Sequence, residues 1–358
     1  MAAGFRIEDI DKNFVTDKSF DPTGLKFYNV LEKPFKVYGL ILPTDEDRRF
    51  SRVPKAIADN TSHGVSVLNY HTAGGRVRFR TNSKRIAVFA SLYRVMKMSH
   101  FAFSGTVGID VYVNGKFSRT FIPPLDVEDS FAMVKSFNDS EMKEIQLNLP
   151  LYSGLDELHI GLDEGAIVEE GRGYDYDKPI VYYGSSITQG ACASRPGNSY
   201  EAIIERETNC DYINLGFSGS AKGEKIMAEH IASLDMKIFV LDYDHNAPSV
   251  EELLATHEPF YKTVREKHPD LPIIIATRPD CSMISTEEAK ERKRIVRRTY
   301  LNAKKRGENV YFIDGEKMMR KYAGADGTVE GIHPNDLGFR GIANGYGKII
   351  KEALKKQK

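Results

Sequence analysis

The chain has no tryptophan, few cysteines and no excess of charge of either sign. Its three cysteines, Cys192, Cys210 and Cys281, form no CxxC pair and leave one thiol unpaired in any disulfide scheme, so we expect a reduced compartment. Lysine plus arginine equal aspartate plus glutamate at 50 each. Without a basic field, the chain is not expected to bind nucleic acid or an anionic membrane.

Long apolar runs are also missing. No segment of the 358 residues approaches the roughly 20 apolar residues needed to cross a bilayer. Residues 1–9 lack the apolar core of a secretory signal. The expectation is therefore a cytoplasmic protein without membrane contact, or a secreted one if a signal peptide has been removed.

The first half of the chain is rich in short β-type runs separated by turn signals. Asn114-Gly115 is a strong hairpin turn, and several runs alternate apolar and polar residues. This pattern, without helices, predicts an antiparallel β-sandwich of the jelly-roll kind. The expected strands lie at 65–68, 76–80, 86–89, 109–113, 145–149 and 158–160.

From Pro179 the pattern changes to strand followed by helix, five times. Such units predict a parallel sheet covered by helices on both faces. We place the boundary in the polar, glycine-containing stretch before Pro179, which gives domains at 1–174 and 175–358. The expected strands are 180–183, 212–215, 238–242, 273–277 and 310–313, and the expected helices lie near 199–208, 223–233, 250–267, 286–306 and 337–354.

The most informative motif is Gly-Ser-Ser-Ile-Thr-Gln-Gly at 184–190, directly after the first of these strands. A tight turn there can present a serine hydroxyl and free backbone N–H groups at the carboxyl end of the sheet. Taken alone, Ser186 could equally be a helix cap. Two further segments at later strand ends carry Gly219 and Asn246, and a third segment, before the last expected helix, carries His333.

Serine, glycine, asparagine and histidine in this order resemble the four blocks of the SGNH/GDSL hydrolase superfamily. The motif at 184–190 resembles the subgroup with serine in place of the aspartate of Gly-Asp-Ser. Gly108-Ile109-Asp110-Val111-Tyr112 resembles the Gly-x-Asp-Leu-Tyr element of the β-rich domain that often precedes the hydrolase domain. The resemblance implies a flavodoxin-like three-layer α/β/α hydrolase domain after the sandwich, and an architecture similar to that of carbohydrate esterases.

Chemistry assigns the catalytic roles. Ser186 would attack an acyl carbonyl, with His333 as its base, and Ser185 is a competing nucleophile. Glu330 lies three residues before His333 and could fix its tautomer. The superfamily normally has aspartate there, so Asp326 and Asp336 remain alternatives.

The N–H groups of Ser186 and Gly219 and the side-chain amide of Asn246 would receive the oxyanion. Each also has a plainer interpretation, since Gly219 could be only a turn glycine and Asn246 an Asx turn. No metal or organic cofactor is expected, although Asp242, Asp244 and His245 carry groups that could bind a metal.

The sequence indicates the substrate less directly than it indicates the reaction. Arg195 and Arg278 come after strand ends and could touch substrate or form loop salt bridges. Loop aromatics such as Tyr70 or Tyr93 could shape one wall of the cleft. The first hypothesis is a serine esterase acting on short-chain O-acyl, above all O-acetyl, esters of saccharides. The alternatives are an acylesterase or thioesterase for small lipophilic esters, and a carbohydrate-binding protein with an inactive hydrolase fold.

Overall fold

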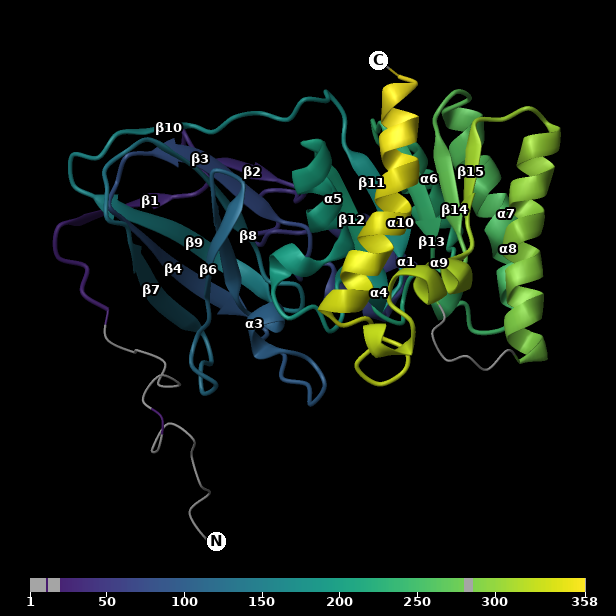
Figure 1. Ribbon diagram of the computed structural model, residues 1–358, viewed down its shortest axis with the longest axis horizontal. Coiled ribbons are helices and arrows are strands. Elements are labelled where there is room, and N and C mark those ends of the chain that lie inside the picture. The colour runs from purple at the N-terminus through teal and green to yellow at the C-terminus, as the bar shows by residue number, and fades with distance from the viewer. Residues whose placement is uncertain (1–10, 12–19, 280–285, 358) are drawn as a thin grey trace, which may run out of the picture.

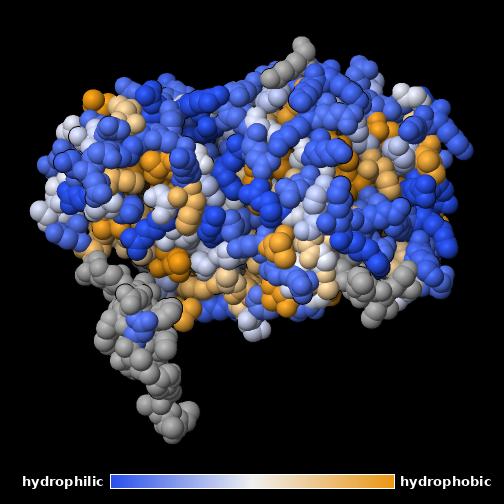
Figure 2. Space-filling model, viewed as in Figure 1, coloured by the Kyte–Doolittle hydropathy of each residue, from blue (hydrophilic) through white to orange (hydrophobic). Residues whose placement is uncertain are grey.

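The computed structural model describes residue 11 and residues 20–279 and 286–357. Cys281 therefore lies outside the described residues. A β-rich region, residues 20–170, lies beside a parallel-sheet region, residues 180–357, along the long axis of the molecule (Figure 1). The exposed face drawn in Figure 2 is mainly hydrophilic, with small separate hydrophobic patches. No helix among the described residues combines the length and the apolar character that a membrane span requires.

The β-rich region is a sandwich of two antiparallel sheets around one apolar core, as the strand pattern predicts. The first sheet has the order β1-β9-β4-β7, and the second has the order β10-β3-β8-β5-β6, with β2 beside β3. The strands are β1 Leu25–Asn29, β2 Lys36–Tyr38, β3 Arg76–Thr81, β4 Arg85–Tyr93, β5 Ile109–Val113, β6 Lys116–Phe121, β7 Ser130–Ser136, β8 Lys143–Asn148, β9 Gly154–Asp163 and β10 Val168–Glu170.

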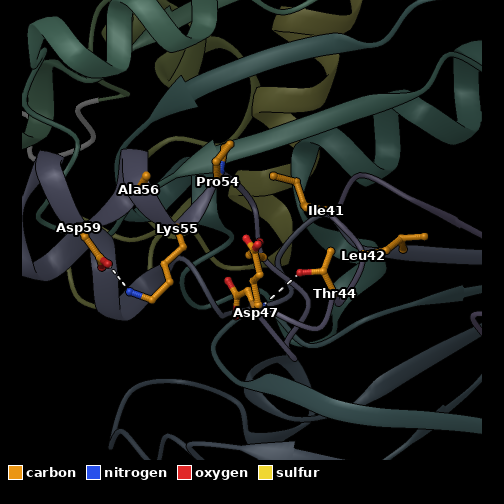
Figure 3. Close-up of a pocket in the computed structure, with 10 residues that line it drawn as sticks. Ile41, Leu42, Thr44, Asp47, Pro54, Lys55, Ala56 and Asp59 are labelled. Atoms are coloured by element: carbon orange, nitrogen blue, oxygen red, sulfur yellow. Dashed lines mark hydrogen bonds and ion pairs between the residues drawn. The ribbon is translucent and has the colours of Figure 1, made fainter.

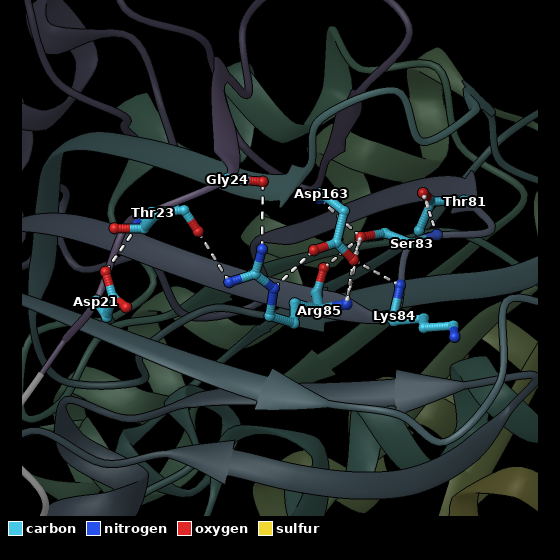
Figure 4. A network of polar contacts seen from close by, with 8 residues as sticks. All are labelled: Asp21, Thr23, Gly24, Thr81, Ser83, Lys84, Arg85 and Asp163. Carbon is cyan, nitrogen blue, oxygen red and sulfur yellow. Dashed lines mark hydrogen bonds and ion pairs between the residues drawn. The ribbon is translucent and has the colours of Figure 1, made fainter.

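Two local features of the sandwich follow from sequence. Asn114 and Gly115 both have positive φ, 50° and 75°, and form the hairpin turn expected between β5 and β6. Asp163, at the end of β9, accepts hydrogen bonds from Ser83 Oγ and from the backbone and side chain of Arg85 (Figure 4). Burial acts to raise the pKa of Asp163, but these bonds outweigh it and hold the pKa below its usual value.

The prediction of a helix-free first half is wrong. The structure contains α1 Lys55–Thr61, α2 His63–Leu68 and the single turn α3 Phe103–Thr106. The run at 65–68, expected as a strand, belongs to α2. Ser62 caps this helix by accepting a hydrogen bond from Val65 N (3.2 Å). A short apolar run cannot by itself distinguish a strand from a buried helical turn.

The second region has a five-stranded parallel sheet in the order β12-β11-β13-β14-β15. This is the 2-1-3-4-5 order of flavodoxin-like folds. The strands match the predicted ones to within one residue at each end, because buried parallel strands appear as continuous apolar runs. They are β11 Ile180–Gly184, β12 Tyr212–Gly216, β13 Ile238–Asp242, β14 Ile273–Ala276 and β15 Val310–Ile313.

Helices cover both faces of this sheet (Figure 1). One face packs against α5 and α10, and the other against α6, α7 and α8. Four of the long helices begin at a side-chain cap from serine, threonine or asparagine, which explains why their starts were predictable. The helices are α4 Ser186–Gln189, α5 Tyr200–Thr208, α6 Lys225–Ala232, α7 Val250–Lys267, α8 Glu287–Lys305, α9 Gly315–Tyr322 and α10 Asp336–Lys355.

Buried polar contacts join the two regions. Arg76 on β3 is fully buried, pairs with Asp211 and donates to Tyr212 O (3.0 Å). Asp110 on β5 accepts from Arg195 (2.9 Å) and from Gly197 N (2.7 Å). The Gly-x-Asp-x-Tyr element of the sandwich therefore holds the loop that follows α4.

Candidate functional site

Ser186 lies at the carboxyl end of β11, where the strand turns into α4. Ser185 is the N-cap of this short helix, and its Oγ accepts from Ile187 N (3.2 Å). Ser186 is the first helical residue and is partly exposed. The helix lies directly on β12 because Gly216 has no side chain, and a Cβ there would be 2.2 Å from Gln189 N. Ser185 is thus occupied as a cap, and Ser186 is the serine presented to solvent.

His333 connects Ser186 to Glu330. Its Nε2 lies 2.9 Å from Ser186 Oγ, and its Nδ1 lies 2.5 Å from Glu330 Oε1. The backbone N–H of His333 also donates to both carboxylate oxygens of Glu330, at 3.1 and 3.2 Å. A carboxylate can only accept, so these partners assign the proton to Nδ1 and leave Nε2 free to take the serine proton.

A tight turn brings Glu330 and His333 together. Val329 N donates to His333 O (2.9 Å), and Gly331 adopts φ 93°, a conformation that favours glycine. Of the alternative acids, Asp336 accepts from the backbone and hydroxyl of Ser194. Glu330 is therefore the carboxylate hydrogen-bonded to the imidazole, and the three-residue turn accommodates its extra methylene.

Hydrogen bonds keep the Glu330 carboxylate ionised. Partial burial acts to raise its pKa, but the ring and backbone N–H groups of His333 outweigh this effect. The net result is a pKa below the usual value for glutamate, which favours a fixed negative charge beside the imidazole.

The expected oxyanion donors come from the ends of three neighbouring strands. Gly219 has φ 64° and is exposed, with nothing within 4 Å of the position of a Cβ. Asn246, in the turn after β13, donates from Nδ2 to Phe217 O (2.9 Å). This bond uses one of its two amide hydrogens and leaves the second for a ligand.

The two arginines proposed as substrate contacts have different surroundings. Arg195 donates to Asp110 (2.9 Å) and Tyr112 (2.7 Å), and its guanidinium lies 3.8 Å from the centre of the Phe117 ring. These contacts correspond to the salt-bridge interpretation. The backbone N–H of Arg278 donates to Asp244 Oδ2 (3.1 Å), which fixes the main chain after β14.

Aromatic side chains from the β-rich region lie beside the imidazole, and the sequence did not reveal them. The rings of His100 and Phe101 lie 5.8 and 6.2 Å from that of His333, and Tyr152 OH donates to Ser186 O (3.3 Å). The suggested aromatics Tyr70 and Tyr93 pair with each other at 5.8 Å. No local pattern marks residues 100 and 101, because their role depends on a contact across more than 230 residues.

One group of possible metal ligands occurs among the described residues. Ligand atoms of His100, Cys192 and His333 lie within 4.8 Å of one another. Burial and the charge of Glu330 raise the pKa of the Cys192 thiol to about 12, which favours its neutral form. A cation there would compete with Ser186 for the imidazole. Within the described chain, the suggested set of Asp242, Asp244 and His245 forms no such group.

A separate hollow of about 500 Å³ lies on the β-rich region (Figure 3). Its polar groups are partly paired with one another, since Lys55 binds Asp59 and Asp47 N donates to Thr44 (3.1 Å). None of Ser186, His333 and Glu330 lines it.

Sequence comparison matches both regions to known families. Residues 177–351 match the GDSL-like lipase/acylhydrolase family, and residues 25–168 match the N-terminus of SGNH-hydrolase-type esterases. A structure described as a GDSL-like lipase from Bacteroides ovatus is 32% identical, with a TM-score of 0.82, over 92% of this chain and 98% of that chain. The chain belongs to the GDSL-like lipase/acylhydrolase family. It is therefore a carboxylic ester hydrolase.

Two further solved structures share the fold of this GDSL-like hydrolase. The salicylyl-acyltransferase SsfX3 of a tetracycline biosynthetic pathway is 22% identical, with a TM-score of 0.75, over 90% of this chain and 96% of that chain. An acetyl xylan esterase from Butyrivibrio proteoclasticus is 13% identical, with a TM-score of 0.56, over 93% of this chain and 99% of that chain. No curated protein matches the sequence.

Proposed function

We propose that this GDSL-like hydrolase is a serine esterase that removes short acyl groups, above all acetyl groups, from saccharides. The observation that carries the proposal is the continuous chain of hydrogen bonds from Ser186 through His333 to Glu330. A serine hydroxyl needs an adjacent base to become a nucleophile, and the base needs a group that orients it.

The reaction would proceed in two halves. Ser186 Oγ attacks the ester carbonyl carbon while its proton moves to His333 Nε2. The C–O bond to the alcohol then breaks, the alcohol takes the proton from Nε2, and the acyl group stays on Ser186. A water molecule attacks this acyl-enzyme and gives a proton to Nε2, which returns it to Ser186 as the acid leaves.

Each tetrahedral intermediate places negative charge on the former carbonyl oxygen. The N–H groups of Ser186 and Gly219 and the second amide hydrogen of Asn246 would donate to that oxygen. Donors fixed in advance stabilise charge that develops only in the transition state.

The saccharide assignment is supported by His100 and Phe101. These rings come from the β-rich region, His100 is exposed, and both lie beside His333. An aromatic face provides a platform for the C–H groups of a sugar ring. The shared fold of an acetyl xylan esterase is consistent with the same substrate class.

A second candidate is an esterase for small lipophilic esters. It is favoured by exposed apolar side chains close to His333 in sequence: Val329, Ile332 and Leu337 are 46%, 52% and 50% exposed. Exposed apolar residues near a site fit an apolar substrate group. A comparison of acetyl with octanoyl 4-nitrophenyl esters separates the two candidates.

The decisive experiment measures acetate release from acetylated xylan, mannan, pectin and oligosaccharides. The Ser186→Ala variant serves as the blank and Ser185→Ala as the matched control. We expect release by the native chain and by Ser185→Ala, and none by Ser186→Ala. A fluorophosphonate should label Ser186 in the native chain and in Ser185→Ala, and should not label Ser186→Ala. Labelling of Ser185, or full activity in Ser186→Ala, would contradict the mechanism.

A further inference from the structure

Gln189 belongs to the serine motif and has no role in the mechanism above, yet all of its polar atoms are used. It is fully buried at the end of α4. Its Oε1 accepts from Ser218 N (3.0 Å), and its Nε2 contacts Leu151 O (3.1 Å) and His71 Nδ1 (3.1 Å). Leu151 and His71 both come from the β-rich region.

These partners determine where the hydrogens of the Gln189 amide and of the His71 ring lie. The N–H of Ser218 can only donate and the carbonyl of Leu151 can only accept, so the orientation of the Gln189 amide is fixed. The second Nε2 hydrogen then points at His71 Nδ1, which must accept it. His71 is therefore neutral, with its proton on Nε2.

The environment of His71 favours the neutral ring, while its buried Nε2 has no hydrogen-bond partner among the described residues. The side chain is 1% exposed, and its burial, with the positive charges of Arg52 and Arg94, lowers its pKa to about 3. An imidazole that cannot take a proton at neutral pH stays a permanent acceptor for Gln189.

Through Gln189, the contact with His71 reaches Ser218, which lies in the loop that carries the proposed oxyanion donor Gly219. Ser218 directly precedes Gly219, and the same loop is held at Gly216 O by the Arg52 guanidinium, which also lies 4.2 Å from the centre of the Phe217 ring. The β-rich region thus holds the loop at 216–219 at two points. An oxyanion donor loses effect when it moves by a fraction of an ångström, because its hydrogen bond is strong only over a narrow range of distance.

We propose that Gln189 and His71 are positioning residues that hold the Gly219 N–H in place for the oxyanion, so that the β-rich region completes the catalytic site. The inference rests on the proposed serine-esterase function. It assigns to the first half of the chain a part in kcat in addition to any part in substrate binding.

The test compares His71→Leu with His71→Asn on 4-nitrophenyl acetate. Asparagine offers an acceptor oxygen near the position of Nδ1, whereas leucine offers none. We expect His71→Leu to lower kcat by about 10- to 100-fold, part of the cost of a lost oxyanion donor, with KM within about twofold. His71→Asn should keep kcat within about threefold of the native value. The rate of fluorophosphonate labelling should follow kcat.

Arg76→Met is the matched control, because Arg76 is also fully buried between the two regions but contacts the start of β12, at Tyr212. The melting temperature of Arg76→Met should be lower than that of the native chain, while its kcat should equal the native value. If His71→Leu does not fold, Gln189→Met removes the same contact from the other side.

Three results would overturn the inference: native kcat in a folded His71→Leu or Gln189→Met variant, equal losses in His71→Leu and His71→Asn, or an equal loss in Arg76→Met. A native chain without turnover would contradict the esterase function itself, which is a different result from an active His71→Leu variant.

Discussion

Asn246 has two amide hydrogens, and Phe217 O already takes one of them. The Asn246→Ala variant removes the proposed donor to the oxyanion, so kcat should fall about 10²–10³-fold with little change in KM. Steady-state kinetics on 4-nitrophenyl acetate measures both. Asn309→Ala removes an amide that bonds Asp270 O in another loop and should leave both constants unchanged. A change confined to KM would mean that Asn246 binds the ground state.

Glu330 differs from the aspartate usual in this family, and its role can be tested by charge. Glu330→Gln keeps the shape but removes the negative charge that supports the imidazolium, so kcat should fall steeply. The roughly 10⁴-fold effect of the corresponding change in a serine protease is an upper guide, since the turn is partly open to water. Glu330→Asp keeps the charge and should lose less. Equal activity of the native chain, Glu330→Gln and Glu330→Asp would mean that the Glu330 carboxylate has no part in catalysis.

The same variant should change the pH profile. The low pKa of Glu330 keeps its carboxylate charged across the range in which an imidazole titrates. Without this anion, protonation of the ring is less favourable, so the acidic limb of kcat/KM should move to lower pH in Glu330→Gln. A pH series from 4 to 9 measures the limb. An unmoved limb would show that the charge does not act on the imidazole.

At the scale of elements, the turn that carries Glu330 and His333 depends on Gly331. Its φ of 93° is strained for any residue with a Cβ, although space is available. Gly331→Ala should cost on the order of 1–2 kcal/mol of local conformational energy and shift the turn, which lowers kcat. Gly307→Ala, at φ 76° after α8 with equal space, is the control and should keep kcat. Similar kcat values in both variants would mean that the turn tolerates the change.

Sequence patterns predicted the parallel-sheet region well and the β-rich region less well. Continuous apolar runs and helix caps marked β11 to β15 and most of the helices around them. Five strands of the sandwich, β1, β2, β6, β7 and β10, carry weak or no alternation and were not predicted. The helix α2 was mistaken for a strand, because four residues are too few to establish a helical period.

The features of the candidate site that depend on sheet topology or on local sequence spacing were predictable. The carboxyl ends of neighbouring parallel strands must meet, which brings Ser186, Gly219 and Asn246 together. The contact between Glu330 and His333 was predictable from their three-residue spacing. The contacts of His71 and His100 were not predictable, because the sandwich and the parallel sheet pack through loops that carry no periodic signal.

At the scale of the whole molecule, two buried neutral histidines link stability to pH. Burial lowers the pKa of His71 and of His257 from 6.5 to about 3. At a pH between these two pKa values, each of the two histidines binds a proton in the unfolded chain but not in the folded chain. The contribution of these histidines to the free energy of unfolding therefore falls as pH falls from 7 to 5. Each such group contributes up to about 1.4 kcal/mol per pH unit.

Urea unfolding at pH 7 and pH 5 measures this effect. The free energy of unfolding of the native chain, relative to that of His257→Asn, should fall from pH 7 to pH 5, because the asparagine keeps a polar group near Thr299 but does not titrate. The same change in the free energy of unfolding in both proteins would mean that His257 takes up its proton in the folded state.

The contacts at Arg52, His71 and Leu151 also limit how this enzyme can be recombined with its relatives. A chimera that joins the sandwich of one hydrolase to the parallel sheet of another would keep both cores but mismatch the residues that hold the loop at 216–219. Those three positions and Gln189 must then be transferred as one set. On the proposed mechanism, the sequence needed for catalysis extends beyond the segments that carry Ser186 and His333 and includes residues of the β-rich region.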